Sequence, residues 1–224
     1  RFFNQQEPEV APVNLSNAEM LEKLDGTMVG VFFPTGDPQN PQWHTRKMMS
    51  THEPDMQKWL RGFQMTDKFQ LLPLIGQYVK RLKFDKEDAH YTYVFEFIHA
   101  NSLVLTKYAE NQYGLYLLAA RNLQTHEEEP EDALDQIAAK IGASRPQRWD
   151  SVADEDQIRS MMQKVASEIE DFEGYVFRDR ETGNRMKVKD PDYVRKHHML
   201  DNLSPKKLLP KVLEGEDEVV AYFP

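Results

Sequence analysis

The stretch from position 90 to position 108, "HYTYVFEFIHANSLVLTKY", decides the fold class. Aromatic residues stand at positions 91, 93, 95 and 97, and Thr, Val, Glu and Ile stand between and after them. An alternation with a period of two predicts a strand that buries its aromatic face. "ANS" predicts a turn, after which "LVLTKY" (103–108) is expected to return as the partner strand. The centre of the fold is therefore expected to be an antiparallel hairpin.

Short apolar runs that end at turn residues predict further strands. They are "TMVGVFF" (27–33), the return strand "WHTRKMM" (43–49), "YGLYLLAARN" (113–122), and a hairpin of "EGYVFRD" (173–179) with "MKVKD" (186–190). Helices are expected at 51–63, 67–83, 127–143 and 154–171, the second interrupted by Pro73, with a short capped segment at 15–22 and a partly helical tail after 204. This irregular order predicts an α+β fold of mainly antiparallel sheets flanked by helices.

The composition narrows the possible functions. The 224 residues include no cysteine, which excludes disulfides, Cys–zinc sites and thiol catalysis and favours an intracellular protein. No apolar run approaches the ~20 residues that a membrane span needs. Neither a Walker loop, GxGxxG nor HExxH occurs, so P-loop, Rossmann and zincin enzymes are not expected. The chain opens on "RFFN" without a methionine, and we expect that a preceding stretch is missing.

The net charge of -9 argues against a general nucleic-acid binder, because phosphate contacts need basic surface. The charge is uneven, however, and the tract at 178–211 is rich in Lys and Arg. This tract indicates either a local phosphate-binding face or an ordinary solvated surface. The methionine pairs at 48–49 and 161–162 are expected to pack in the core.

Three features could carry chemistry. Lys23 lies in K-x-D-G, directly ahead of a predicted strand. Glu96 is a carboxylate within an apolar strand, where an unpaired charge would be costly. Glu173 stands at a strand start, and Lys187 and Lys189 project from one face of the strand that follows. Each also has a plain reading, namely a hairpin corner with a solvated lysine, an edge-strand glutamate and a solvated K-x-K strand.

Taken together, these residues are what lysine attack on a nucleotide requires. The lysine must lose its proton to act as a nucleophile, and nearby positive charge lowers a lysine's pKa. Carboxylates can hold a divalent metal that bridges the phosphates. Fixed lysines balance the charge on the α-phosphate and on the departing pyrophosphate.

The motifs resemble, in order, those of the bacteriophage T4 RNA ligase 1 family, within the covalent nucleotidyltransferases. The resemblance covers nearly the whole chain and rests on "RFFN", "KLDG" (23–26), "HTRKMMS", "YVFEFIHANSLVLTKY", "LYLLAARN", "EGYVF" (173–177) and "KVKDPDYVRKHH". It implies a nucleotidyltransferase (ATP-grasp-like ligase) core. In this family a strand pair precedes "RFFN" and a further domain follows the core, and both are expected to be absent here. Met28 occupies a position where DNA ligases and capping enzymes carry arginine, which disfavours those branches.

The resemblance implies a role for each matching residue. Lys23 would attack the ATP α-phosphate and hold AMP as a phosphoramidate. Glu96 would bind the ribose hydroxyls or help to position metal, and Glu173 would serve the metal and the later transfer steps. Lys187 and Lys189 would contact the phosphates.

Other matching positions are expected to border the nucleotide. Asp25 would make the tight turn that presents the lysine at the nucleotide. Arg1, in place of a family lysine, and Phe3 would lie beside ATP. Arg46, also in place of a lysine, would face phosphate or RNA. Asp217, in "GEDE", would be linked to the metal.

The resemblance implies an ATP- and Mg²⁺-dependent RNA ligase that joins RNA 5′-phosphate and 3′-hydroxyl ends in RNA repair, with tRNA as one candidate substrate. Residues 1–200 would form the nucleotidyltransferase domain, and 201–224 a helical extension or the start of another domain. The location would be cytoplasmic, in the host cell if the chain is phage-encoded. The alternatives are a DNA ligase or capping guanylyltransferase, and a non-catalytic RNA-binding or virion protein on a ligase core.

Overall fold

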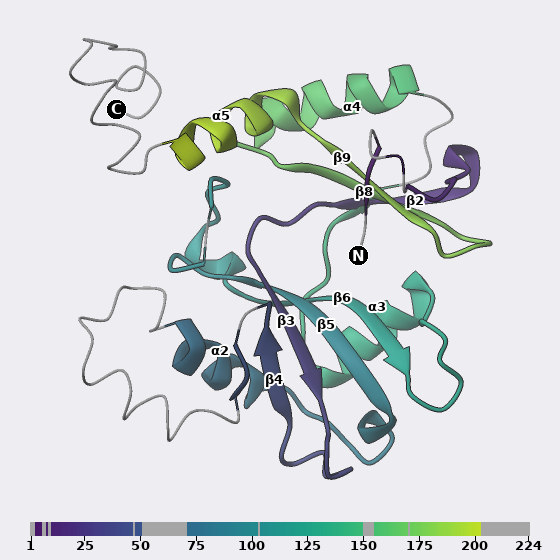
Figure 1. Ribbon diagram of the computed structural model, residues 1–224, viewed down its shortest axis with the longest axis vertical. Coiled ribbons are helices and arrows are strands. Elements are labelled where there is room, and N and C mark those ends of the chain that lie inside the picture. The colour runs from purple at the N-terminus through teal and green to yellow at the C-terminus, as the bar shows by residue number, and fades with distance from the viewer. Residues whose placement is uncertain are drawn as a thin grey trace.

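The structure is a computed structural model that describes residues 3–5, 8, 10–46, 48–50, 71–102, 104–149, 155–169 and 171–202. Its strands form two sheets, one above the other in Figure 1. The upper sheet has the order β1-β9-β8-β2-β7, with bounds β1 Phe3–Asn4, β2 Ala18–Glu22, β7 Arg148–Trp149, β8 Gly174–Asp179 and β9 Arg185–Lys189. The lower sheet has the order β4-β3-β5-β6, with bounds β3 Thr27–Phe32, β4 Gln42–Thr45, β5 Tyr91–Ile98 and β6 Gly114–Asn122.

Four α-helices and three short 3₁₀ turns complete the described chain. The helices are α2 Leu71–Val79, α3 Glu131–Ile141, α4 Glu155–Glu168 and α5 Pro191–Asn202, and the turns are Leu15–Asn17, Asp88–His90 and Glu110–Gln112. All strand pairs are antiparallel except β1 with β9. The α+β fold with mainly antiparallel sheets is therefore confirmed. Within the described chain, every helix is too short or too polar to span a lipid bilayer.

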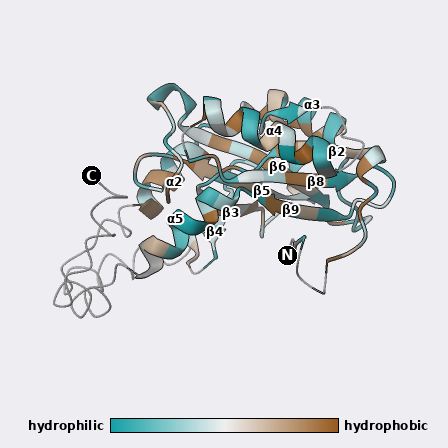
Figure 2. Ribbon diagram, turned by 90° about the horizontal axis from the view of Figure 1, so that it is seen from above, coloured by the Kyte–Doolittle hydropathy of each residue, from teal (hydrophilic) through white to brown (hydrophobic). Residues whose placement is uncertain are grey.

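Each sheet buries one face against helices. In the lower sheet, Tyr93, Phe95 and Phe97 of β5 are fully buried in a core shared with α2 and α3. In the upper sheet, side chains of β2, β8 and β9 pack against α4. The helices alternate hydrophilic and hydrophobic residues along their length, as expected of helices with one buried side (Figure 2). The predicted alternation of β5 is confirmed. Its second face, which carries Val94 and Glu96, points into the space between the sheets.

The predicted hairpin partner of β5 is wrong. The strand that pairs with β5 along its whole length is β6, and no described residue of 104–108 is in a strand. The reason is that the backbone donors of this segment have another acceptor. Leu105 N and Thr106 N donate to Asp25 Oδ2 at 2.9 and 3.0 Å, so the chain curls onto a carboxylate instead of a neighbouring strand.

Two other local predictions are also corrected. The segment at 15–22 is a 3₁₀ turn followed by the strand β2. β2 lies between β8 and β7, and its residues Ala18 and Met20 are fully buried. Pro73 does not interrupt α2, whose described part begins two residues earlier at Leu71. The helix predicted at 51–63 and the predicted tail lie outside the described residues.

The return strand is shorter than predicted. β4 ends at Thr45, and the chain turns back so that Thr45 N donates to Met48 O at 2.8 Å. Met49 bridges to His44 and is 41% exposed, so the prediction that it packs in the core is wrong. Met162, of the second pair, is buried in the core as predicted.

Gly174 provides a test of how β8 is placed. Its φ of +138° is a conformation that glycine adopts at little cost, and a Cβ there would overlap Val188 O and lie 2.8 Å from Lys189 Cα. We expect Gly174→Ala to lower the free energy of unfolding by about 2 kcal/mol or more, measured by urea denaturation. Gly114→Ala is the control, because no heavy atom lies within 4 Å of its Cβ position. Equal stability of the two variants would contradict this account of the β8–β9 pairing.

Candidate active site

Lys23 is held where the chain leaves the upper sheet. β2 ends at Glu22, and Lys23 N donates to Gly174 O at 2.9 Å. Its Nζ lies 2.5 Å from Glu173 Oε2, while Glu173 Oε1 lies 2.9 Å from Lys189 Nζ. The Glu173 side chain is 5% exposed. A buried carboxylate thus lies between two lysines that reach it from β9 and from the end of β2.

The Asp25–Gly26 turn connects Lys23 to the lower sheet. Asp25 is buried, and its Oδ2 accepts the two hydrogen bonds from the backbone of residues 105 and 106. Its N–H donates to the Tyr108 hydroxyl at 3.0 Å. Gly26 N donates to Glu96 Oε1 at 3.2 Å, and a Cβ on Gly26 would overlap Phe97 O. The turn is therefore fixed on both sides. Asp25 stabilises this turn through hydrogen bonds within the protein, and it does not line the cavity described next.

A cavity of about 370 Å³ lies between the two sheets, beside Lys23. Lys23, Glu96 and Lys187, which belong to three separate strands or strand ends, line it together. Apolar walls come from both sheets, and charged side chains close the far end. The remaining lining residues are Leu21, Glu22, Leu24, Met28, Val94, Leu118, Ala119, Glu128, Glu131, Arg145, Pro146, Val176 and Arg185.

Burial changes the acidity of the carboxyl groups in this cavity. Burial, opposed by the attraction of Lys23 and assisted by the nearby Glu173 carboxylate, raises the pKa of Glu96 to about 8. Burial also raises the pKa of Glu22, which lines the cavity next to Lys23. The cavity therefore favours an uncharged Glu96 carboxyl group at neutral pH.

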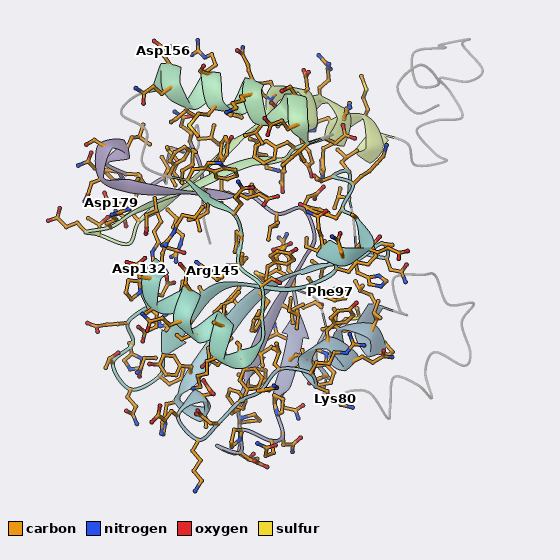
Figure 3. All side chains as sticks on the ribbon, turned by 180° about the vertical axis from the view of Figure 1, so that it is seen from behind. Lys80, Phe97, Asp132, Arg145, Asp156 and Asp179 are labelled. Carbon is orange, nitrogen blue, oxygen red and sulfur yellow. The ribbon has the colours of Figure 1, made fainter. Side chains whose placement is uncertain are left out.

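An ion-pair network joins the two sheets at the far end of the cavity. Glu131, at the start of α3, pairs with Arg145 and with Arg178 of β8. Arg185 of β9 pairs with Glu128. Arg148 of β7 pairs with Glu19 of β2 and with two carboxylates of α3, and Figure 3 shows Asp132 and Arg145 in the region between the sheets. Removing one partner of a buried ion pair lowers the free energy of unfolding by several kcal/mol. This network therefore holds the sheets at a fixed separation.

Helix α5 is tied to the same site. Tyr193 is buried, and burial together with the carboxylates of Glu173 and Asp25 raises its pKa, Asp25 being also its hydrogen-bond partner. Lys189 Nζ lies 5.5 Å from the centroid of the Tyr193 ring. Lys196 of α5 pairs with Asp171, whose carbonyl accepts from the Thr106 hydroxyl at 2.7 Å. The helix, the loop after β5 and the Lys23 turn thus form one connected unit.

The structure brings together five of the residues singled out from the sequence, namely Lys23, Glu96, Glu173, Lys187 and Lys189. Phe3 belongs to β1, which pairs with β9 so that Asn4 is opposite Lys187. Arg46 is exposed and lines a separate groove on the lower sheet. Arg1 and Asp217 lie outside the described residues.

Sequence reasoning missed the ion-pair network and several cavity residues. The acidic run at 127–135 contains Glu128 and Glu131, but it was interpreted as the capped start of a helix. Nothing in this run indicates that Glu128 and Glu131 pair with arginines more than ten residues away. Leu118 and Ala119 line the cavity from a strand that the sequence predicted only for its apolar content.

Few carboxylates lie near Lys23, so they could hold a metal ion only if most of its ligands came from a substrate. Among the residues that the structure describes, no three His, Asp or Glu side chains converge as a ligand set. Glu173 and Glu96 are the two acidic groups beside the lysine, and Glu173 already carries two ion pairs. Mg²⁺ is commonly held by one or two carboxylates together with phosphate oxygens and water, which matches this donor set.

The raised pKa of Glu96 predicts a pH-dependent stability. Between about pH 4.5 and about pH 8 the folded protein keeps a proton that the unfolded chain releases, so ionisation of Glu96 destabilises the fold as the pH rises. We expect Glu96→Gln to be more stable than the parent at about pH 8, by on the order of 2 kcal/mol, and close to it at about pH 4.5. Urea denaturation at several pH values measures the difference. Glu127→Gln, an exposed control, should show none, and a pH-independent effect of Glu96→Gln would contradict the assignment.

Comparison with known proteins places this chain in a family. Two forms of an archaeal ATP-dependent RNA ligase share the fold with a TM-score of 0.57, at 11% and 12% identity, over 92% and 97% of this chain and 52% and 57% of theirs. A Naegleria gruberi RNA ligase variant with ATP and Mn has a TM-score of 0.50, at 14% identity, over 83% of this chain and 52% of its own. A search of curated proteins finds no match.

The chain spans about half the length of the solved RNA ligases that it resembles. The sequence model of the RNA ligase family matches residues 1–193, which confirms the resemblance that the motifs indicated. Because this match covers most of the 224 residues, the chain belongs to the RNA ligase family.

Proposed function

We propose that this chain is the nucleotidyltransferase core of an ATP-dependent RNA ligase that works through a lysyl-AMP intermediate on Lys23. One observation carries the proposal. Lys23 Nζ lies at a cavity between two sheets, 2.5 Å from a buried carboxylate, with Lys187 of the upper sheet and Glu96 of the lower sheet lining the same cavity. Family membership and the ATP bound to the Naegleria gruberi RNA ligase support ATP as the nucleotide.

In the first step, Lys23 Nζ would attack the α-phosphorus of ATP. A nitrogen–phosphorus bond forms, the bond from the α-phosphorus to the bridging oxygen breaks, and pyrophosphate leaves. Glu173 Oε2 is close enough to Nζ to take the proton that the amine must lose. Lys187 and Lys189 would balance the charge that develops on the phosphates.

Glu173 would hold a divalent ion together with phosphate oxygens, and Glu96 would bind the ribose or assist at the metal. When bound, the ion supplies charge neutralisation on the transferred group. The Naegleria gruberi RNA ligase was determined with Mn, and we propose Mg²⁺ as the ion for this chain.

The later steps use the same residues. An oxygen of an RNA 5′-phosphate would attack the AMP phosphorus, and the Lys23 amine leaves. The RNA 3′-hydroxyl then attacks the activated 5′-phosphate, a phosphodiester forms and AMP departs. We propose residues 1–200 as the domain that carries these steps, with broken RNA strands, tRNA included, as substrates in RNA repair.

Covalent labelling tests the role of Lys23. We expect the parent chain, incubated with ATP and Mg²⁺, to gain the mass of one adenylate that pyrophosphate removes, and Lys23→Ala to gain none, because no other amine is expected to replace its Nζ. Lys83→Ala, an exposed lysine at a different pocket, should label like the parent. Mass spectrometry of the intact protein gives the readout. Equal labelling of Lys23→Ala, or labelling by GTP in place of ATP, would overturn the proposal.

A further inference from the structure

The lower sheet carries a second concave surface on the face away from α2 and α3. An open groove of about 790 Å³, here called the outer groove, is lined chiefly by Phe32, His44, Arg46, Met49, Thr92 and Leu123. Val29 and Val31 of β3 pack into the core, so Gly30 and Phe32, which alternate with them, face the other way. The outer groove thus occupies the sheet face that also forms a wall of the nucleotide cavity.

The outer groove and the nucleotide cavity are connected along β3. Met28 lines the cavity and Phe32 lines the groove, four residues further along one strand, which is about 13 Å. Gly30, between them, has no side chain, and the His44 ring lies over it where a Cβ would be. A chain that extends from the cavity along this strand therefore meets the His44 ring over Gly30 and then the Phe32 ring.

Phe32 and His44 form an aromatic surface at the groove. Their ring centroids are 6.1 Å apart at 57°, and both side chains are partly exposed. A contact between His44 Nδ1 and Thr45 O at 3.1 Å holds the imidazole in place. Among the described residues, four large apolar side chains are prominently exposed, and three of them, Met28, Met49 and Leu123, line either the cavity or this groove.

Arginine side chains lie at the outer groove. No carboxylate is among its described lining residues, and Arg46, which lines it, is exposed. Arg121 of β6 is also exposed, and it pairs with Thr92, so its side chain belongs to the same face of the sheet. Glu128, which bridges to Arg121, is ion-paired with Arg185. Arg46 and Arg121 therefore favour an anionic partner at this face.

We propose that the outer groove binds an unstacked, single-stranded segment of the RNA substrate. Its bases lie against Phe32 and His44, and its phosphates face Arg46 and Arg121. Aromatic side chains beside a cationic edge form the surface on which single strands stack, whereas a duplex keeps its base faces covered. The inference rests on the proposed function in one respect, that the 5′ end of this strand lies at the Lys23 cavity.

Direct binding tests this inference without ATP. The probe is a 5′-phosphorylated single-stranded RNA of about 12 nucleotides, labelled at its 3′ end and followed by fluorescence anisotropy. We expect Phe32→Leu, which keeps an apolar side chain but removes the ring, to weaken binding about tenfold. Arg121→Glu should weaken it by a similar factor and reduce its salt dependence. Arg159→Glu, on the exposed surface of α4, is the charge-matched control and should bind like the parent.

The alternatives give different results. Unchanged RNA affinity of Phe32→Leu and Arg121→Glu, or equal affinity for the same strand in a duplex, would overturn the inference. Thermal unfolding checks that Phe32→Leu is folded, and Leu123→Glu, at an exposed position, is a second groove variant that should bind more weakly. AMP labelling of Lys23 should be unchanged in all three groove variants. If the parent itself is not labelled, the proposed function fails, while the binding data still decide on the groove.

Discussion

The fold is organised around one buried carboxylate with two lysine partners. Glu173 would be costly to bury alone, and it is stabilised because Lys23 and Lys189 reach it from the end of β2 and from β9. The same three segments are joined by backbone bonds, from Lys23 N to Gly174 O and from Asp190 N to Glu173 O, both at 2.9 Å. The position of the Lys23 amine is thus a direct consequence of strand pairing in the upper sheet.

A second set of charges fixes the other end of the cavity. The pairs of Glu131 with Arg178 and of Glu128 with Arg185 cross between the sheets, so the cavity walls cannot separate without exposing unpaired ions. Ion-paired side chains therefore lie at both ends of the cavity, while its side walls are apolar. This distribution suits a ligand with a charged part and a flat, less polar part, which is the character of a nucleotide.

Part of the fold and of the candidate site could be predicted from the sequence. The period-two alternation at 91–98 correctly predicted a strand with an aromatic core face, because side-chain direction in a strand follows directly from sequence order. The gathering of Lys23, Glu96, Glu173 and Lys187 was reached only through resemblance to a family, since their spacing of up to 164 positions contains no local signal. The partner of β5 was missed because Asp25, some 80 residues away, accepts the backbone bonds of the segment after it. Long-range hydrogen bonds of this kind, and the arginines that meet Glu128 and Glu131, have no periodicity to detect.

Helix α5 adds a mechanical property to the site. Its Tyr193 is hydrogen-bonded to Asp25, its Lys196 is paired with Asp171, and it begins two residues after Lys189. A displacement of this helix is consequently transmitted through these three attachments to the turn that carries Lys23. The position of the Lys23 amine therefore depends on α5 as well as on the two sheets.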